Sequence, residues 1–208
     1  LAQGWLDYLV PQLYWPIDRT AQAFPVLLDY WLAPGQNPRG RHVWPGLFTS
    51  MVGAPQRPWP AQEIVDQVAL TRTRPAATGH AHFSLIALAQ DREGLATRLA
   101  QGAYAQPALV PRTPWLGDTP PTAPMLRRRW RGELQLVSGD GGPEAFLHAV
   151  WRRSGGRWHF ALQPAHDRGV AADGTTDAVV VSAVDRLGNE SPRTALRLLA
   201  HRADPETA

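Results

Sequence analysis

The first residues that could do chemistry stand at the end of an apolar segment, where Gln12, Tyr14 and Trp15 lie close together. In an extended strand alternate residues share a face, so Gln12 and Tyr14 point to one side and Leu13 to the other. An amide and a phenol in these positions can hydrogen-bond a hydroxylated ligand, and Trp15 offers a flat apolar face for a sugar ring. The competing interpretation is that Tyr14 and Trp15 are core aromatics that close a sheet. The pattern alone supports both equally.

A second alternating group of polar side chains contains His80, His82 and Ser84, with Phe83 among the residues that separate them. In a strand the three polar residues share one face. If that face lines a binding site, His82 and Ser84 can hydrogen-bond a substrate there. A His-x-His pair can also bind zinc, but no third ligand stands at a supporting spacing. We therefore expect no metal and no cofactor.

Short apolar segments that alternate with helical patterns must position these side chains. The expected strands cover residues 4–15, 42–50 and 79–88. The expected helices lie within residues 16–33, where Asp18 is a plausible N-cap, and at residues 61–73 and 92–101. This order repeats in units of roughly 35 to 40 residues, which suits a parallel sheet with right-handed crossovers.

Three such units fill the first ~118 residues, whereas a complete (β/α)8 barrel needs about 250. We therefore predict that residues 1–118 form the C-terminal portion of a TIM barrel, about strands six to eight. The competing architecture is a small free-standing α/β sheet, whose three parallel strands would leave uncovered edges. Leu1 to Gly4 resemble the last turn of a helix already in progress, so we expect this chain to be the C-terminal part of a longer protein.

A proline-rich stretch separates this region from a different kind of sequence. Five prolines stand between residues 109 and 124, and we place the domain boundary near Asp118. Beyond it the sequence predicts strands and turns, with strands at residues 133–138, 146–152, 157–162, 178–185 and 194–201. Short strands at this spacing indicate that residues 119–208 form an all-β sandwich.

Composition and charge exclude several classes of protein. A length of 208 residues with 44% hydrophobic content allows one or two folded domains. All 21 basic residues are arginines, but the net charge of +3 is too small to indicate a nucleic-acid partner. The absence of cysteine excludes disulfides and a thiolate nucleophile. No apolar run approaches the ~20 residues of a membrane span, so we expect no span in this chain.

Sequence motifs follow one another in a specific order along residues 1 to about 116. They are residues 4–8 (GWLDY), residues 11–15 (PQLYW), the helix that ends at Trp31, Gly46 and Gly53, Trp59 with Glu63, Ile64 and Gln67, Phe83 with Ser84, and residues 104–115. Together they resemble the glycosyl-hydrolase-like family ten proteins, which are bacterial envelope enzymes with a (β/α)8 barrel. In that family the first two motifs belong to the sixth strand.

Residues 179–192 (VVVSAVDRLGNESP) look like the penultimate strand and the following hairpin of a fibronectin type III domain. The resemblance covers residues 120 to about 201. Such domains often follow bacterial glycosidase barrels. The resemblance implies a fibronectin type III-like β-sandwich at residues 119–208, and it implies fold far more than function.

Glycoside hydrolysis needs two carboxylates that flank the bond to be cleaved. No Asp or Glu stands at the C-terminal ends of the three expected strands, where barrel enzymes keep their catalytic groups. Asp7 begins its strand, Asp18 lies in a loop, and Glu63 and Asp66 belong to an outer helix. The family resemblance implies an acidic catalytic motif after the fourth strand, upstream of this chain. We therefore expect substrate contacts here, with the catalytic residues unidentified.

The resemblance implies a glycoside hydrolase that acts on a bacterial glycan, and peptide-free peptidoglycan strands are the most specific expectation. On this interpretation Gln12, Tyr14, Trp15, His82 and Ser84 contact the glycan, and the fragment alone is inactive. The same resemblance implies a periplasmic or secreted protein, with a lipoprotein anchor as one form of attachment.

Two other functions stay open. The aromatic residues can hold a glycan without cleaving it, as in a non-catalytic carbohydrate-binding or cell-envelope adhesion module. The run Arg127-Arg128-Arg129-Trp130-Arg131 can instead bind an anionic polymer, with strong salt dependence. A solvated edge strand, whose charges prevent sheet-to-sheet association, explains the same arginines.

Overall fold

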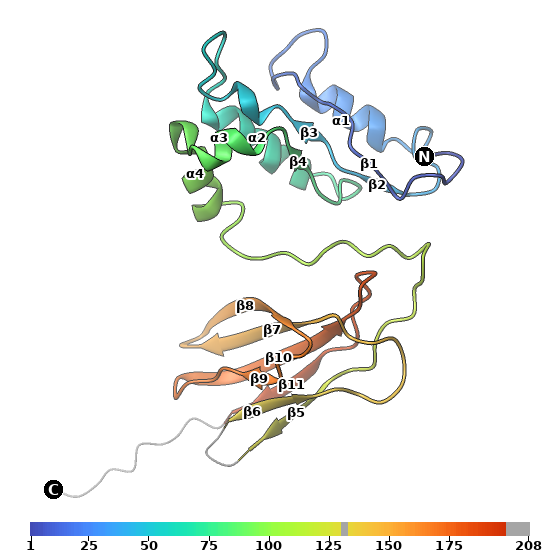
Figure 1. Ribbon diagram of the computed structural model, residues 1–208, viewed down its shortest axis with the longest axis vertical. Coiled ribbons are helices and arrows are strands. Elements are labelled where there is room, and N and C mark those ends of the chain that lie inside the picture. Colours follow the sequence, from blue (N-terminus) through green and yellow to red (C-terminus); the bar gives the residue numbers. More distant parts are fainter. Residues whose placement is uncertain (130–132, 199–208) are drawn as a thin grey trace, which may run out of the picture. The chain divides into compact units, whose positions relative to one another are not determined.

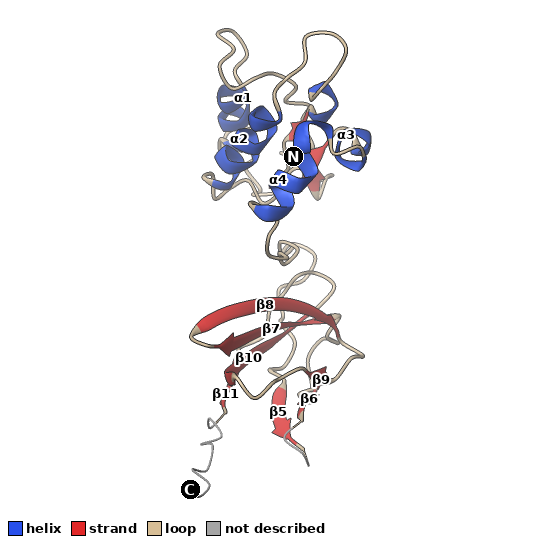
Figure 2. Cartoon of the chain, turned by 90° about the vertical axis from the view of Figure 1, so that its left-hand side faces the viewer, coloured by secondary structure: helices blue, strands red, loops and turns tan. Residues whose placement is uncertain are grey.

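The computed structural model describes residues 1–129 and 133–198. Contacts within the chain divide it into two compact units, Leu1–Ala105 and Gln106–Ala208. Figure 1 colours the first unit from blue to green and the second from green to red. The helices of the described residues belong to the first unit, and the second consists of strands and loops (Figure 2). None of these helices combines the length and apolar character needed to cross a membrane.

The first unit contains very short strands and several helices without a regular repeat. In chain order its elements are β1 (Tyr8–Leu9), α1 (Phe24–Leu32), β2 (His42–Val43), β3 (Gly46–Leu47), the 3-10 helix η1 (Thr49–Met51), α2 (Ala61–Arg72), β4 (Ala81–His82), α3 (Leu85–Ala89), the 3-10 helix η2 (Arg92–Gly94) and α4 (Leu95–Gln101). The expected helix at residues 61–73 is confirmed by α2.

Three segments of this unit run parallel to one another. β1 pairs with β2, and β3 pairs with β4 through Gly46 opposite Ala81 and Leu47 opposite His82. A single bridge joins Gln12 to Gly46. The register therefore places Gln12, Gly46 and Ala81 side by side, and residues two positions further along each segment also become neighbours.

One face of these segments is covered by helices. Leu13 and Leu47 point into a core that is built with side chains from α1, α2 and α4. The buried members of this core are Leu13, Phe24, Leu28, Leu47, Val52, Ala61, Ile64, Val68, Leu95 and Leu99. Full burial of each leucine-sized side chain contributes about 1.5–3 kcal/mol, so this face fixes the orientation of the three segments. The opposite face carries the candidate site.

The second unit consists of two antiparallel sheets. Its strands are β5 (Met125–Arg128), β6 (Leu134–Val137), β7 (Leu147–Ser154), β8 (Arg157–Pro164), β9 (Gly169–Val170), β10 (Thr176–Val184) and β11 (Thr194–Arg197). One sheet has the order β11-β10-β7-β8, and the other has the order β5-β6-β9. Gly155 and Gly156, both with positive φ, make the two-residue turn between β7 and β8 that such a hairpin requires.

A separate apolar core holds the two sheets together. Val150, Val179 and Val181 extend from the four-stranded sheet. Leu134 and Leu136 extend from the three-stranded sheet and pack in the same cluster. Each unit thus has its own core, as expected for independent folding units.

The fold prediction of a partial TIM barrel followed by a fibronectin type III sandwich is wrong. Across residues 1–129 and 133–198 no barrel closes and no sustained β/α alternation exists, because each sheet of the first unit pairs over only two residues. Most strand residues belong to the antiparallel sheets of the second unit, so the chain is β-rich. Pro11 and Pro45 explain part of the difference, since proline has no N–H to donate to a ladder.

Several predicted boundaries also differ. The expected strand at residues 79–88 ends at His82, because Leu85–Ala89 form α3. Asp18 is not a helix cap: α1 begins at Phe24 after Ala23, with Pro25 in the first turn where proline is tolerated. In the arginine run, Arg127 and Arg128 lie on β5, whereas Trp130 and Arg131 lie outside the described residues, as do positions 199–201 of the last expected strand.

Candidate functional site

An aromatic cluster occupies the uncovered face of the three parallel segments. The ring of Tyr14 stacks on Phe48, with centroids 4.6 Å apart and planes at 22°, and on Phe83, at 5.5 Å and 27°. Each ring comes from a different segment, two residues after the aligned positions Gln12, Gly46 and Ala81. Phe83 is 53% exposed, so the cluster presents an apolar aromatic surface to solvent. We call these three rings the aromatic platform.

Tyr14 adds a polar group to the platform. Its hydroxyl has no hydrogen-bond partner within residues 1–129 and 133–198, and burial raises the pKa of its phenol above the ordinary value of 10.0. The group is therefore a neutral hydroxyl at physiological pH, able both to donate and to accept. The exposed Gln12 lies on the same face and supplies an amide.

Gly46 allows the ring of Tyr14 to lie over the strand. A Cβ at position 46 would stand 3.2 Å from the carbonyl oxygen of Pro11 and 3.4 Å from the Tyr14 ring. Both distances are tight for a carbon atom, so a larger residue would displace either the ring or the strand pairing. The small residue at this position thus helps to form the platform.

A pair of serines borders the platform. The hydroxyl oxygens of Ser50 and Ser84 are 3.1 Å apart, and the backbone N–H of Ser84 donates to Ser50 Oγ at 2.9 Å. The peptide bond between Phe83 and Ser84 is cis. If Ser50 donates its proton to Ser84, the Ser84 proton is free for another acceptor. A hydroxyl donor therefore stands next to the exposed ring of Phe83.

Trp15 is half-buried, and its backbone is held by α2. The side-chain amide of Gln67 donates to the Trp15 carbonyl oxygen at 3.1 Å and to Glu63 Oε1 at 2.7 Å. Glu63 Oε1 in turn accepts from the backbone N–H of Ile17 at 2.8 Å. Gln67 is fully buried, so this network fixes the direction in which the chain leaves the platform.

His82 does not share the face of Gln12 and Tyr14. Its register partner is Leu47, which is fully buried in the core, so His82 points toward the helices. His82 Nδ1 is 2.8 Å from Thr49 Oγ1 and His82 Nε2 is 2.7 Å from the Tyr104 hydroxyl. Both ring nitrogens are thus engaged, and burial lowers the pKa of the imidazole. The contact between His82 and a substrate stays a prediction, because neither ring nitrogen is free to make it.

His80 and His82, both half-buried, belong to one chain of hydrogen bonds. His80 Nε2 is hydrogen-bonded to the same Tyr104 hydroxyl. Burial lowers the pKa of His80 to about 4, with further lowering by the nearby His82 and Arg72. Burial also raises the pKa of Tyr104 to about 12, although Arg72 opposes this change. No group of three His, Asp or Glu that could hold a metal occurs in the described part of the chain.

The carboxylates of the first unit mostly serve structural contacts. Glu63 accepts from the backbone of Ile17, as described, and Glu93 accepts from the backbone N–H of Ala61 at 3.0 Å. Asp29 forms an ion pair with Arg74 at 3.0 Å. Asp18 lies exposed in a turn. These contacts identify no acid and base pair, and the catalytic residues stay unassigned.

Sequence analysis missed two members of the platform. Phe48 and Phe83 were not predicted to contact a ligand, although each lies within an expected strand and Phe83 belongs to one of the family motifs. The signal that could have found them is the spacing from Gly46 and Ala81, but it is informative only once the register is known. Trp59 packs edge-on against Phe48 at 6.1 Å and against the helical core, so it supports the platform from behind.

Comparison with known proteins shows a relationship to glycosyl hydrolases. The chain is 31% identical over 208 aligned residues to "Glycosyl hydrolase YngK" of Bacillus subtilis (strain 168), covering 92% of this chain and 41% of that protein. It is 38% identical over 55 residues to "Glycosyl hydrolase DigH" of Escherichia coli (strain K12), covering 26% of this chain and 12% of that protein. The chain thus spans about two fifths of the first relative and a smaller part of the second.

No family model matches the sequence, and no solved structure matches the chain. The similarity to YngK and DigH shows a relationship to proteins named glycosyl hydrolase. Membership of family ten and of the fibronectin type III domains is not confirmed.

Proposed function

We propose that this chain supplies a glycan-contact surface to a glycoside hydrolase of the bacterial cell envelope. The observation that carries the proposal is the aromatic platform, because its exposed ring surface lies next to the hydroxyl groups of Tyr14 and Ser84 and the amide of Gln12. The relationship to glycosyl hydrolases makes a carbohydrate the expected ligand. Glycan strands of peptidoglycan that lack peptides are the proposed substrate.

The platform fits the two kinds of contact that a sugar makes. The apolar face of a sugar ring packs on Phe83 and Tyr14, and aromatic packing of this kind contributes about 0.5–1.5 kcal/mol beyond the burial of area. The polar edge of the ring meets Gln12, the Tyr14 hydroxyl and the Ser84 hydroxyl. Trp15 extends the apolar surface, while half-buried His82 acts indirectly through its hydrogen bond to Thr49, which precedes Ser50.

Hydrolysis itself requires a pair of carboxylates, one acting as acid and one as nucleophile or base. Glu63 and Glu93 hold backbone N–H groups, which supports a binding role for this chain. We propose that the catalytic pair belongs to another part of the full-length protein. On this view the chain orients the glycan and the rest of the enzyme cleaves it.

Binding of peptide-free peptidoglycan strands to the whole chain tests the platform. Phe83→Ala removes an exposed ring and should weaken binding roughly five- to thirtyfold, the equivalent of about 1–2 kcal/mol. Tyr30→Ala on α1 is the matched control, because Tyr30 is 50% exposed and lies outside the platform. Equal binding by the two variants would contradict the proposal.

A non-catalytic carbohydrate-binding or adhesion module is the second candidate. The structural engagement of Glu63 and Glu93 favours it as much as it favours a divided enzyme. The full-length protein separates the two functions: an enzyme releases new reducing ends from the glycan strands, whereas an adhesion module binds them without any release.

A further inference from the structure

The second unit contains a histidine whose polar atoms are unexplained by its fold. His148 on β7 is only 1% exposed. It lies on the same strand face as Val150, so its ring points between the two sheets. Neither Nδ1 nor Nε2 has a hydrogen-bond partner in the described residues. Buried polar atoms are normally paired, so the imidazole of His148 needs a water molecule, an ion or a ligand to complete its hydrogen bonds.

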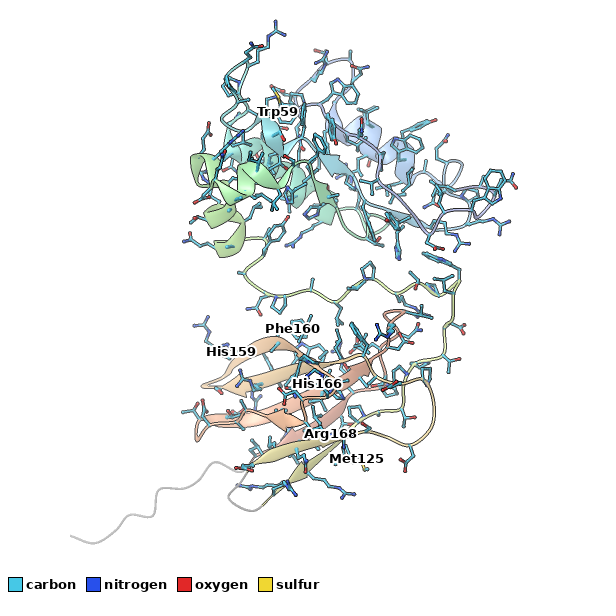
Figure 3. The ribbon with its side chains drawn as sticks, viewed as in Figure 1. Trp59, Met125, His159, Phe160, His166 and Arg168 are labelled. Atoms are coloured by element: carbon cyan, nitrogen blue, oxygen red, sulfur yellow. The ribbon has the colours of Figure 1, made fainter. Side chains whose placement is uncertain are left out.

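His148 forms part of the wall of a cavity of about 460 Å³. Three segments of the second unit enclose the cavity with it: residues 121–124, the loop at residues 138–145 and the segment at residues 165–168. Figure 3 labels His166 and Arg168, which both come from the segment that joins β8 to β9. This volume lies within the range of roughly 300–1,000 Å³ that is typical of small-ligand sites.

The loop wall of the cavity is held in a fixed shape. The Thr122 hydroxyl donates to the carbonyl oxygens of Asp140 at 3.2 Å and Gly141 at 2.7 Å. A Cβ at Gly139 would lie only 2.4 Å from Thr122 Cγ2, so the two segments pack directly against each other. A cavity with such walls is formed before any ligand arrives, which reduces the ordering cost of binding.

Charge distinguishes one end of the cavity. The Arg168 side chain is exposed, and no carboxylate pairs with it in the described ranges. Burial, followed by the positive charge of Arg168, lowers the pKa of His148 and keeps the imidazole neutral. The other ionisable groups that line the cavity are Asp140, Glu144 and His166, all exposed. A buried neutral imidazole thus lies near a guanidinium that is free to bind an anion.

We propose that this cavity binds a sugar acid, through its carboxylate to Arg168 and through a hydroxyl group to His148. A guanidinium binds a carboxylate with two parallel hydrogen bonds. A neutral imidazole offers one donor and one acceptor, which is the complement of an alcohol. A simple carboxylate would leave His148 unpaired, and a neutral sugar would leave Arg168 unused. A hydroxylated carboxylate satisfies both groups.

A second cavity, of about 840 Å³, adjoins the first and shares five lining residues with it: Pro143, Glu144, Ala145, Ala165 and His166. There Arg186 lies over the exposed ring of Phe146 at 4.5 Å. Neighbouring sugars of a longer acidic glycan can extend into this space. The site is in the other unit from the aromatic platform, so it goes beyond the proposed function and does not depend on it.

Titration of the whole chain with glucuronate tests the site. The imidazole signals of His148 are followed by NMR at pH 7, with glucose as the ligand without a carboxylate and acetate as the ligand without hydroxyl groups. We expect saturable shifts of the His148 signals with glucuronate and at least tenfold weaker binding of glucose and acetate. Equal affinities for the three ligands, or no shift of His148, would overturn the proposal.

Two variants and one control assign the contacts. Arg168→Gln and His148→Leu should each weaken glucuronate binding at least tenfold, whereas Arg157→Gln, an exposed arginine at the β7–β8 turn, should leave it unchanged. His148→Leu should not lower the denaturation midpoint, because it removes two unpaired buried nitrogens. Wild-type binding by Arg168→Gln would refute the assignment, even if His148→Leu failed to fold.

Discussion

Acidification from pH 7 to pH 5 should destabilise the first unit through His80. The folded chain holds the pKa of this imidazole at about 4, below its ordinary value of 6.5, because the ring is buried and faces His82, Arg72 and the Tyr104 hydroxyl. The unfolded chain therefore takes up a proton as the pH falls below 6.5, while the folded chain does not. Stability is present at neutral pH and is lost as the pH falls toward 4.

The size of the effect follows from the two pKa values. At pH 5 the unfolded histidine is about 1.5 pH units below its pKa, and each unit corresponds to about 1.4 kcal/mol, so His80 alone should cost about 2 kcal/mol of unfolding free energy. The pKa values of His82 and His148 are also lowered by burial, so the total loss in the whole chain is larger. The His80 contribution must therefore be isolated by substitution.

Urea denaturation of the whole chain at pH 7 and at pH 5 measures this contribution. Backbone NMR signals of Leu13 and Leu47 report the first unit, and those of Val179 and Val181 report the second. His80→Gln keeps a polar group near Tyr104 without an imidazole, and it should reduce the pH-dependent loss in the first unit by about 2 kcal/mol.

His159→Gln on β8 is the control, because this histidine is exposed and lies in the second unit. It should leave the pH dependence of the first unit unchanged. If His80→Gln retained the wild-type loss to within about 0.5 kcal/mol, the assignment of the effect to His80 would be refuted.

Three further predictions concern single contacts. Gly46→Val should cost about 1–3 kcal/mol and displace the Tyr14 ring, which urea denaturation and the Tyr14 ring signals in NMR would report. Gln67→Leu should cost about 1–3 kcal/mol in the same assay, because the Trp15 carbonyl oxygen loses its donor. Gly156→Ala should cost about 1 kcal/mol by forcing a side chain into positive φ, whereas Gly35→Ala, at an open position, should be nearly neutral in thermal denaturation.

Local patterns in the sequence predicted several elements correctly. Alternation from Gln12 to Tyr14 separated the exposed face from the buried Leu13, and helical spacing located α2. Both features depend on residues close together in the chain, where periodicity alone determines which side chains share a face. That Gln12 and Tyr14 share one face could be predicted for the same reason, whereas their contact with a glycan stays a prediction.

Features that depend on distant segments could not be predicted. The pattern His80-Ala81-His82 shows that the two histidines share a face, but only the pairing of His82 with Leu47 shows that this face is not the one that carries Tyr14. The same pairing brings Phe48 and Phe83 together. The predicted strands were also too long, because Pro11 and Pro45 interrupt the hydrogen-bond ladders and Leu85 begins a helix.

The Tyr104 hydroxyl links two imidazoles but carries a single proton. It can therefore donate to only one of them, and the other must donate to the phenol oxygen. The tautomers of His80 and His82 are correlated as a result: when one ring carries hydrogen on Nε2, the other does not. Thr49 must reverse its own role in step with His82. The chain of four groups thus has two proton arrangements with fixed heavy atoms, which exchange only if several protons move together.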